Sequence, residues 1–547
     1  MIGPSGRDRI VHYALAALLL LPLLLAFAGS GGFSDAYGTY QTSDPAALAA
    51  RRWALAAATG RSLLIGVLAT LLGLALGIPA GWFLAQRGGG RSARSPCLLA
   101  LAALPLALPP SVAVSGWIGL LAPAGAASRF NAPILGFAPE TRGWLFSSAG
   151  AAFVLGLSLW PIVAFEAWPA FRRVRFSEAY DAALLYGSRS RCFWRVVLPQ
   201  SKGELAAGAL LAFLLASSDF CVSSLLMVRT LPIEIHDALT VGKTAAAAWA
   251  ALPLLIMVLA IAAVLHCGAA VPAACRRDAC TTSARSSPVA CVFLVAGVLL
   301  GFALPMCVCL LQTLTGGRPM STVFGAGSDA LLTSVRLAGA ATLLAVFVAV
   351  LRAVLWPQAR VQPLNTAGLF LLAVPGSFLA AALLTAQLQL TQCMPVQTFA
   401  AIIPPLILTL GYLARFIYVP LRLVEEGLAA LDPDLFDAAA LAGQNRLARG
   451  ISIALPLVVP HIAAAAALVF VLSLGEVAIA DKLHPPGVTP ATVWLFQQQH
   501  LGYDEAVFGL SLLLGAVVAA VLLAAGITMS VLSVRLGRTQ APNRIGG

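Results

Sequence analysis

The chain has 547 residues, of which 60% are hydrophobic and only 10% are charged, and its mean hydropathy is +0.91. About a quarter of the residues in a soluble domain are charged, so this composition excludes a soluble protein. The formal net charge is +12, but no basic patch interleaved with aromatic residues lies outside the apolar stretches. This excludes nucleic-acid binding and predicts a polytopic membrane protein embedded in a lipid bilayer.

Apolar stretches recur along the whole chain. Crossing a bilayer takes roughly 20 helical residues, whereas the strands of a membrane β-barrel would alternate over about ten. The stretch after Arg7 and Arg9 is longer than the core of a secretory signal peptide, which favours an uncleaved helix over that alternative. We therefore expect an all-α protein with about twelve transmembrane helices, over residues 10–28, 59–84, 97–122, 145–169, 205–227, 247–272, 289–313, 331–356, 364–389, 399–422, 458–480 and 506–534.

The positive charges between these stretches predict the orientation. Placing the N-terminus in the cytoplasm puts most Lys and Arg residues on the cytoplasmic side, in agreement with the positive-inside rule. Examples are Arg87, Arg91, Arg94, Arg172, Arg173, Arg175, Arg276, Arg277, Arg535 and Arg538. We expect both termini to be cytoplasmic in a plasma (inner) membrane.

The chain contains an internal repeat. "DAALLYG" at 181–187 returns as "DAAALAG" at 437–443, and each copy is followed by a Leu-Pro pair. Ser62 and Ser334 each open an apolar stretch, and Pro109 and Pro375 each interrupt one. This predicts two tandem six-helix repeats of the same orientation, residues 1–275 and 289–547, joined by a cytoplasmic linker at 276–288.

Each repeated loop has the signals of a short helix. In the second copy, 432–456, Asp432 is suited to cap the helix, Pro433 to its first position and Gly443 to the residue past its end. In the first copy, 177–199, Ser177 and Gly187 have the matching places. Such a short helix is marginal alone in water, which favours docking to a partner over an amphipathic helix lying on the lipid surface.

The two loops resemble the EAA loop of permease subunits of binding-protein-dependent ABC importers. In that family the loop forms a coupling helix that binds in a groove of a cytoplasmic ATPase. The resemblance covers the chain as two fused permeases of the type I importer class. It differs in having Asp where the family has Glu, and in a first loop one residue shorter. The residues to which it assigns ATPase coupling are Asp181, Ala182, Ala183, Gly187, Pro199, Asp437, Ala438, Ala439, Gly443 and Pro456.

The resemblance also implies partners and a cargo. The partners would be two cytoplasmic ABC ATPase subunits, which bind the ATP, and a periplasmic or extracellular substrate-binding protein; the chain would have no cofactor and no enzymatic activity of its own. Fused permeases of ferric-iron and thiamine importers are the most similar, and ferric iron is the expected cargo. Thiamine, a polyamine or an anion are alternatives, and a secondary transporter is the alternative class.

Two carboxylates inside predicted membrane helices are candidates for the translocation pathway. Asp219 and Glu476 each lie 20 residues after the Pro of their own loop, so they are repeat equivalents and should face each other. Ionisable groups in a membrane are costly and often functional, although a helix-to-helix hydrogen bond explains them equally well. For Arg415, also within a span, we expect the side chain to extend to the interface.

Other chemistry finds no support in the sequence. "VGKT" at 241–244 resembles the end of a Walker A loop, but Asp237 stands where that loop needs Gly. The six His residues form no HExxH motif, and Cys275 and Cys280 are not spaced like zinc ligands. We expect neither catalytic residues nor a metal site.

Overall fold

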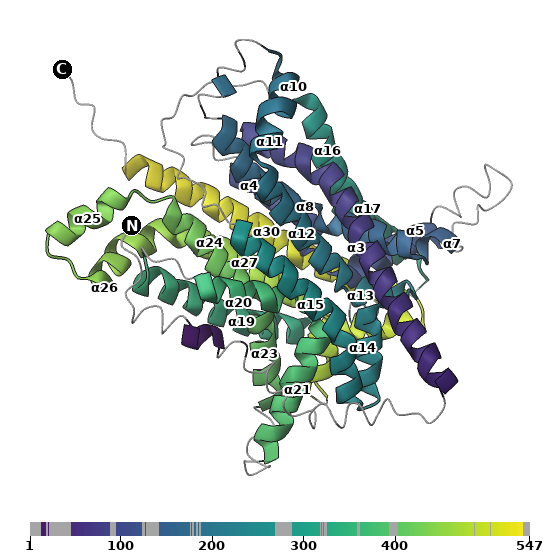
Figure 1. Ribbon diagram of the computed structural model, residues 1–547. Helices are drawn as coiled ribbons and strands as arrows, with labels where there is room; N and C mark the ends of the chain where they lie inside the picture. The colour runs from purple at the N-terminus through teal and green to yellow at the C-terminus, as the bar shows by residue number, and fades with distance from the viewer. Residues whose placement is uncertain are drawn as a thin grey trace, which may run out of the picture.

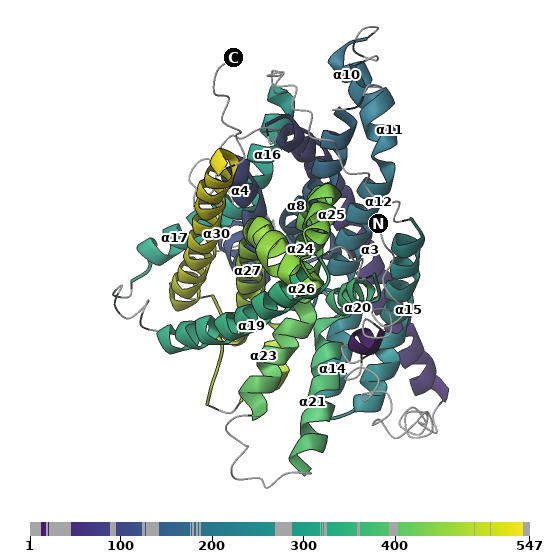
Figure 2. The ribbon, with the colours of Figure 1, turned by 90° about the vertical axis from the view of Figure 1, so that its left-hand side faces the viewer.

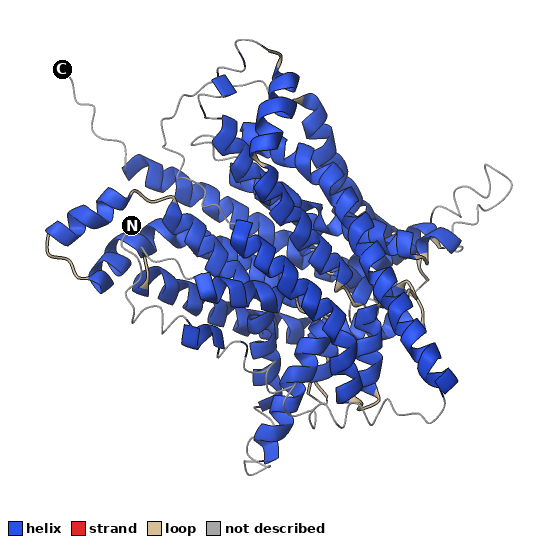
Figure 3. Cartoon of the chain, viewed as in Figure 1, coloured by secondary structure: helices blue, strands red, loops and turns tan. Residues whose placement is uncertain are grey.

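The structure is a computed structural model. It describes residues 13–17, 45–87, 95–122, 142–175, 187–268, 287–317, 327–357, 362–392, 403–485, 487–503 and 505–539, and single residues at 20, 126, 177, 180, 181, 184, 319, 321 and 325. Every regular element in these ranges is a helix (Figure 3). The predicted all-α class is confirmed there.

The N-terminal part, residues 45–268, contains long helices joined by short ones. In chain order they are α3 (Pro45–Arg87), α4 (Ser95–Ala107), α5 (Pro110–Leu121), α7 (Arg142–Leu145), α8 (Ser148–Arg175), α10 (Arg189–Cys192), the π-helical turn η1 (Phe193–Val197), α11 (Leu198–Gln200), α12 (Lys202–Ser217), α13 (Cys221–Leu225), α14 (Leu231–Thr240) and α15 (Thr244–Gly268).

The C-terminal part, residues 287–539, has a similar series. Its elements are α16 (Pro288–Val298), η2 (Leu299–Ala303), α17 (Leu304–Thr315), α19 (Ser328–Leu355), α20 (Gln362–Ala373), α21 (Gly376–Gln392), α23 (Ile403–Phe416), α24 (Tyr418–Ala429), α25 (Pro433–Leu441), α26 (Arg446–Arg449), η3 (Gly450–Ala454), α27 (Leu455–Gly475), α28 (Ala478–Leu483), α29 (Ala491–Leu501) and α30 (Glu505–Thr539).

The described helices show a multi-pass membrane protein. Six are long and apolar enough to cross a bilayer, or nine if each of three bent pairs is one span. The predicted first span lies mostly outside the described residues, the fifth is divided between α12 and α13, and the described apolar part of the sixth, Ala246–Ile261, is shorter than a span. The bundle of about twelve helices stays a prediction.

A π-helical turn precedes each of three Leu-Pro pairs. η1, η2 and η3 end directly before Leu198, Leu304 and Leu455, and the backbone N–H of each of these leucines donates to the carbonyl five residues earlier. The proline that follows has no N–H, and its ring crowds the carbonyl four residues before it. The wider turn relieves this crowding, so the helix continues through the proline.

The segment 288–315, which we call the crossing arm, packs on the N-terminal part. It contacts α3, α4, α5 and α8. The approach is closest at Gly116, where an added Cβ would lie 2.4 Å from the Cα of Pro305. In the other direction, Leu15 and Leu20 pack beside a cluster that includes Phe378 of the C-terminal part. The crossing arm lies beside α3 and α8, and that cluster combines residues of both parts (Figure 1).

Two buried serines make the same hydrogen bond in the two parts. Ser62 Oγ on α3 accepts from the backbone N–H of Leu231, the first residue of α14, at 2.9 Å. Ser334 Oγ on α19 accepts from the backbone N–H of Ala491, the first residue of α29, at 2.7 Å. The first N–H groups of a helix have no partner within it, so each serine satisfies one of them.

A polar contact joins the two parts at the end of the bundle where α14 lies. Lys482 Nζ on α28 donates to Thr240 Oγ1 on α14 at 2.8 Å. His236 Nε2 lies 3.6 Å from Asp481 Oδ2, and the His236 ring stacks on Phe220 with the ring centres 4.2 Å apart. α14 is not among the candidate spans. Burial lowers the pKa of His236 from 6.5 to about 4, and Lys482 lowers it further while Asp481 opposes the shift.

Gly116→Ala should destabilise the protein. The added methyl group would collide with the backbone of Pro305, and overpacking of this kind costs about 1–3 kcal/mol. The matched control is Gly339→Ala in α19, where an added Cβ meets nothing within 4 Å and alanine favours the helix. We expect the midpoint of thermal unfolding in detergent to fall for the first variant only. Equal midpoints would contradict the close packing of the crossing arm.

Acidification should weaken the contact around His236. The unfolded chain binds a proton at the usual histidine pKa of 6.5, whereas the folded chain does so only at about 4, so stability is lost as the pH falls through this window. We expect the unfolding midpoint to fall between about pH 7 and about pH 5, and to fall less steeply in His236→Phe. Parallel slopes for the two proteins would show that His236 does not contribute.

Candidate functional site

A cavity of about 320 Å³ lies between the two parts and is lined equally by both. The lining residues of the N-terminal part come from α4, α5, α8, α12 and α13, and those of the C-terminal part from the corresponding helices. Six of them recur 257 positions later in the same lining, namely Leu211, Leu215, Ser218, Asp219, Phe220 and Cys221, followed by Leu468, Leu472, Gly475, Glu476, Val477 and Ala478. Concave, mostly apolar sites with a few polar groups are typical of ligand binding.

Asp219 and Glu476 both line this cavity, at equivalent breaks between helices. Asp219 Oδ2 accepts from the backbone N–H groups of Val222 at 2.8 Å and Ser223 at 3.3 Å, at the start of α13. Glu476 Oε1 accepts from the N–H of Ile479 at 3.3 Å, at the start of α28. Each carboxylate therefore accepts from free N–H groups at the start of the short helix that follows it, which is a local bond and not the helix-to-helix hydrogen bond considered from the sequence. Their part in translocation stays a prediction.

The expectation that Arg415 extends to the membrane interface is wrong. Its residue is 8% exposed, and its side chain lines the cavity. The guanidinium donates to the carbonyl of Val374, at the 106° bend between α20 and α21, and its Nε lies 3.7 Å from Glu476 Oε2. Sequence reasoning missed these partners because both come from other spans. Snorkelling fails because the side chain meets an acceptor and a counter-charge inside the bundle.

A second arginine adds charge to the cavity wall. Arg422 on α24 also lines it and forms an ion pair with Glu426 at 3.0 Å, between side chains that are 37% and 46% exposed. The pair contributes little to stability because it is partly solvated. Among the described residues, no group of three or more His, Cys, Asp or Glu side chains could hold a metal ion.

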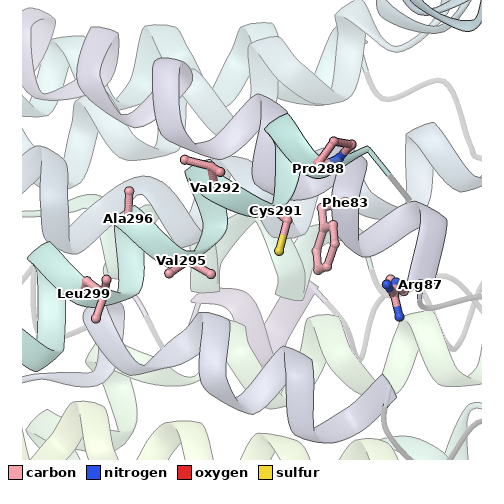
Figure 4. Close-up of a pocket in the computed structure, with 8 residues that line it drawn as sticks. All are labelled: Phe83, Arg87, Pro288, Cys291, Val292, Val295, Ala296 and Leu299. Carbon is pink, nitrogen blue, oxygen red and sulfur yellow. The ribbon is translucent and has the colours of Figure 1, made fainter. Parts of the chain in front are cut away.

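A second hollow lies on the surface between α3 and α16 (Figure 4). Its volume is about 530 Å³. The lining side chains form a row with Arg87 at one end and Leu299 at the other. Val292 and Leu299 in its wall are 63% and 52% exposed. Only one lining side chain is charged, so no set of polar groups converges there. The cavity between the two parts is the better candidate site.

The second repeated loop projects from the bundle. α25 begins at Pro433, with Asp432 Oδ1 accepting from the N–H of Asp434 at 3.0 Å, and Gly443 past its end has a φ of +81°. Asp437, Ala438, Gly443 and Pro456 are exposed and Ala439 is half-buried. α25 and α26 lie at the left of Figure 1, away from α14, and face the viewer in Figure 2. The predicted cap, first position and stop of the helix all agree with this geometry.

The first repeated loop is described only in part. Asp181 is exposed, Gly187 is half-buried and Pro199 is exposed within α11, whereas Ala182 and Ala183 lie outside the described residues. The backbone carbonyl of Ser177 accepts from the backbone N–H groups of residues 180 and 181. The Ser177 hydroxyl donates to the carbonyl of Val174, so this side chain does not act as the predicted helix cap. α10, which is part of this loop, lies at the top of Figures 1 and 2.

A buried aromatic ring holds each loop, and sequence reasoning missed both. Tyr180 is 7% exposed and packs against Trp82, with the ring centres 6.5 Å apart. Phe436 is 3% exposed, and Arg449 Nη1 donates to its carbonyl at 3.3 Å. The two rings stand directly before Asp181 and Asp437, so an aromatic residue at the same place in both repeats was the available signal.

Comparison with known proteins gives the family. No family model matches the chain. Over 212 residues it is 33% identical to "Molybdenum transport system permease protein ModB" of Mycobacterium bovis and of Mycobacterium tuberculosis, which covers 37% of this chain and 75% of each relative. It is 31% identical over 184 residues to the "Probable molybdenum ABC transporter permease protein" of Haloferax volcanii, covering 33% of this chain and 63% of that relative, less than two thirds of its length. Permease subunits are transport components without a catalytic site, so the chain is not an enzyme; it belongs to the permease family of binding-protein-dependent ABC importers.

Proposed function

We propose that the chain forms both permease halves of an ABC importer, residues 1–275 and 289–547, fused in one polypeptide. The match to the mycobacterial relatives covers 75% of each relative but 37% of this chain, so this chain is about twice as long. The equivalent hydrogen bonds of Ser62 and Ser334, and the equivalent helix caps of Asp219 and Glu476, support a duplication. Translocation would follow the cavity between the halves as they rock against each other.

The projecting loop carries the coupling proposal. On its helix α25, the apolar side chains of Leu435 and Leu441 are 46% and 91% exposed, whereas Phe436 is buried in the core. An exposed apolar group on a short helix held by one buried ring suits a docking surface for a partner. We assign the two repeated loops to two cytoplasmic ATPase subunits, which bind and hydrolyse the ATP. Both termini would then lie in the cytoplasm of a plasma-membrane protein.

The proposed cargo is a small oxyanion delivered by a substrate-binding protein. The relatives are named for molybdenum transport, and two arginines line the cavity. Ferric iron, the cargo expected from the sequence, has no specific support from these relatives. Thiamine and polyamines have none either.

The coupling proposal is tested in proteoliposomes that contain the chain, its ATPase and its binding protein, with radiolabelled molybdate as the probe. Gly443 has a left-handed backbone with nothing within 4 Å of an added Cβ, so a side chain there strains the loop without a clash. We expect Gly443→Glu to lower ATP-driven uptake by about tenfold or more, because it adds strain, bulk and charge at the docking surface. Gly187→Glu should do the same through the first loop.

Two controls separate docking from loop folding. Gln444→Glu places the same charge on the next exposed residue, and Gly443→Asn keeps a residue that tolerates the left-handed conformation. Both should retain uptake within about twofold of the wild type. Uptake that continues without the ATPase and follows a proton or sodium gradient would contradict the proposal and favour a secondary transporter.

A further inference from the structure

Arg415 is a buried cation with a donor that makes no hydrogen bond. A guanidinium has five N–H donors, and that of Arg415 donates to the carbonyl of Val374. Its Nε is buried and has no hydrogen-bond partner among the described residues. Glu476 Oε2 lies 3.7 Å from this nitrogen, which is within an ion pair but too far for a hydrogen bond. Glu476 therefore balances the charge of Arg415 without satisfying its donor.

Glu476 has a second partner that does not depend on Arg415. Its other oxygen, Oε1, accepts from the backbone N–H of Ile479 at the start of α28. The same oxygen would lie 2.9 Å from a Cβ added to Gly376, so the carboxylate fits closely against the break between α20 and α21. Removing one partner from a buried ion pair is usually costly because a charge is left alone. Here Glu476 would keep its hydrogen bond from the N–H of Ile479 if Arg415 bound another partner.

Positively charged side chains line the cavity only from the C-terminal part. On α23 and α24 the lining residues include Arg415, Val419 and Arg422, whereas at the same spacing on α8 they are Leu155, Leu159 and Ile162. Both cavity carboxylates already accept hydrogen bonds from backbone amides. The buried donor without a hydrogen-bond partner belongs to Arg415, and a cationic donor suits an anionic ligand rather than a metal cation.

We propose that Arg415 is an anion-binding residue of the cavity, and that a passing oxyanion takes the place of Glu476 beside it. An oxyanion oxygen at about 2.8 Å makes the charge-assisted hydrogen bond that Glu476 does not make. Glu476 keeps its cap on α28 while the anion is bound and returns to Arg415 when the anion leaves. The inference rests on the proposed function and names the residue that binds its cargo.

The test is equilibrium dialysis of radiolabelled molybdate, and separately of sulfate, against the purified full chain in nanodiscs. Arg415→Gln should weaken binding by about tenfold or more, the effect of losing a hydrogen bond to a charged group. Glu476→Gln should bind about threefold to tenfold more tightly, because the competing charge is gone while the side chain keeps its shape. Arg415→Lys, which keeps the charge, should fall between the wild type and Arg415→Gln.

Two further carboxylate variants show whether the effect belongs to Glu476. Glu204→Gln removes one member of the ion pair with Arg173, which does not line the cavity, and should bind within about twofold of the wild type. Asp219→Asn removes the repeat equivalent of Glu476 and should tighten binding less than Glu476→Gln does. Glu476→Gln binding no tighter than Glu204→Gln would overturn the exchange, as would Arg415→Gln binding like the wild type.

Binding and transport are measured separately, so the two proposals can fail separately. No saturable binding of either anion to the wild type or to Glu476→Gln would overturn the anion site. The Gly443 variants in proteoliposomes would still report coupling to the ATPase. Saturable anion binding that depends on Arg415, without any ATP-driven uptake by the wild type, would support the site and contradict the importer.

Discussion

The structure depends on satisfying backbone polar groups wherever a helix begins or breaks in the interior of the bundle. Hydrocarbon offers no water to unpaired N–H and C=O groups, so each break needs a protein partner. Ser62 and Ser334 accept from the first N–H groups of α14 and α29, and Asp219 and Glu476 accept from those of α13 and α28. Arg415 donates to the carbonyl at the break after α20. The polar residues that line the cavity are thus also the residues that make its walls possible.

This double use explains why a mostly apolar cavity has a few charged groups in its wall. A break in a helix frees backbone groups and lets a short helix turn across the bundle, and the side chain that caps it is placed at the cavity wall. The two parts share the caps but differ in the positive charge, because Arg415 and Arg422 line the cavity from the C-terminal part and no Lys or Arg lines it from the N-terminal part.

The sequence predicted what depends on local pattern and repetition. The all-α class, the cap and stop of α25, and the equivalence of Asp219 with Glu476 came from composition, capping residues and spacing. The environment of Arg415 was not predictable, since Val374 and Glu476 come from distant spans. The π-helical turns before the Leu-Pro pairs were also missed, because a proline in a helical pattern suggests a stop or a kink. Local signals therefore predict elements better than the contacts between them.

The crossing arm has a consequence for how the protein is made. Residues 288–315 cover helices that are synthesised long before them, whereas Leu15 and Leu20 pack against a cluster that combines residues of α14 and α15 with residues such as Phe378, which is synthesised more than 300 residues later. The N-terminal segment can enter the bilayer early but cannot reach its final neighbours until most of the chain has been inserted. Contacts of such long sequence separation form slowly. An incomplete chain would leave helix surfaces without their covering segments, which makes it a target for membrane quality control rather than a working half.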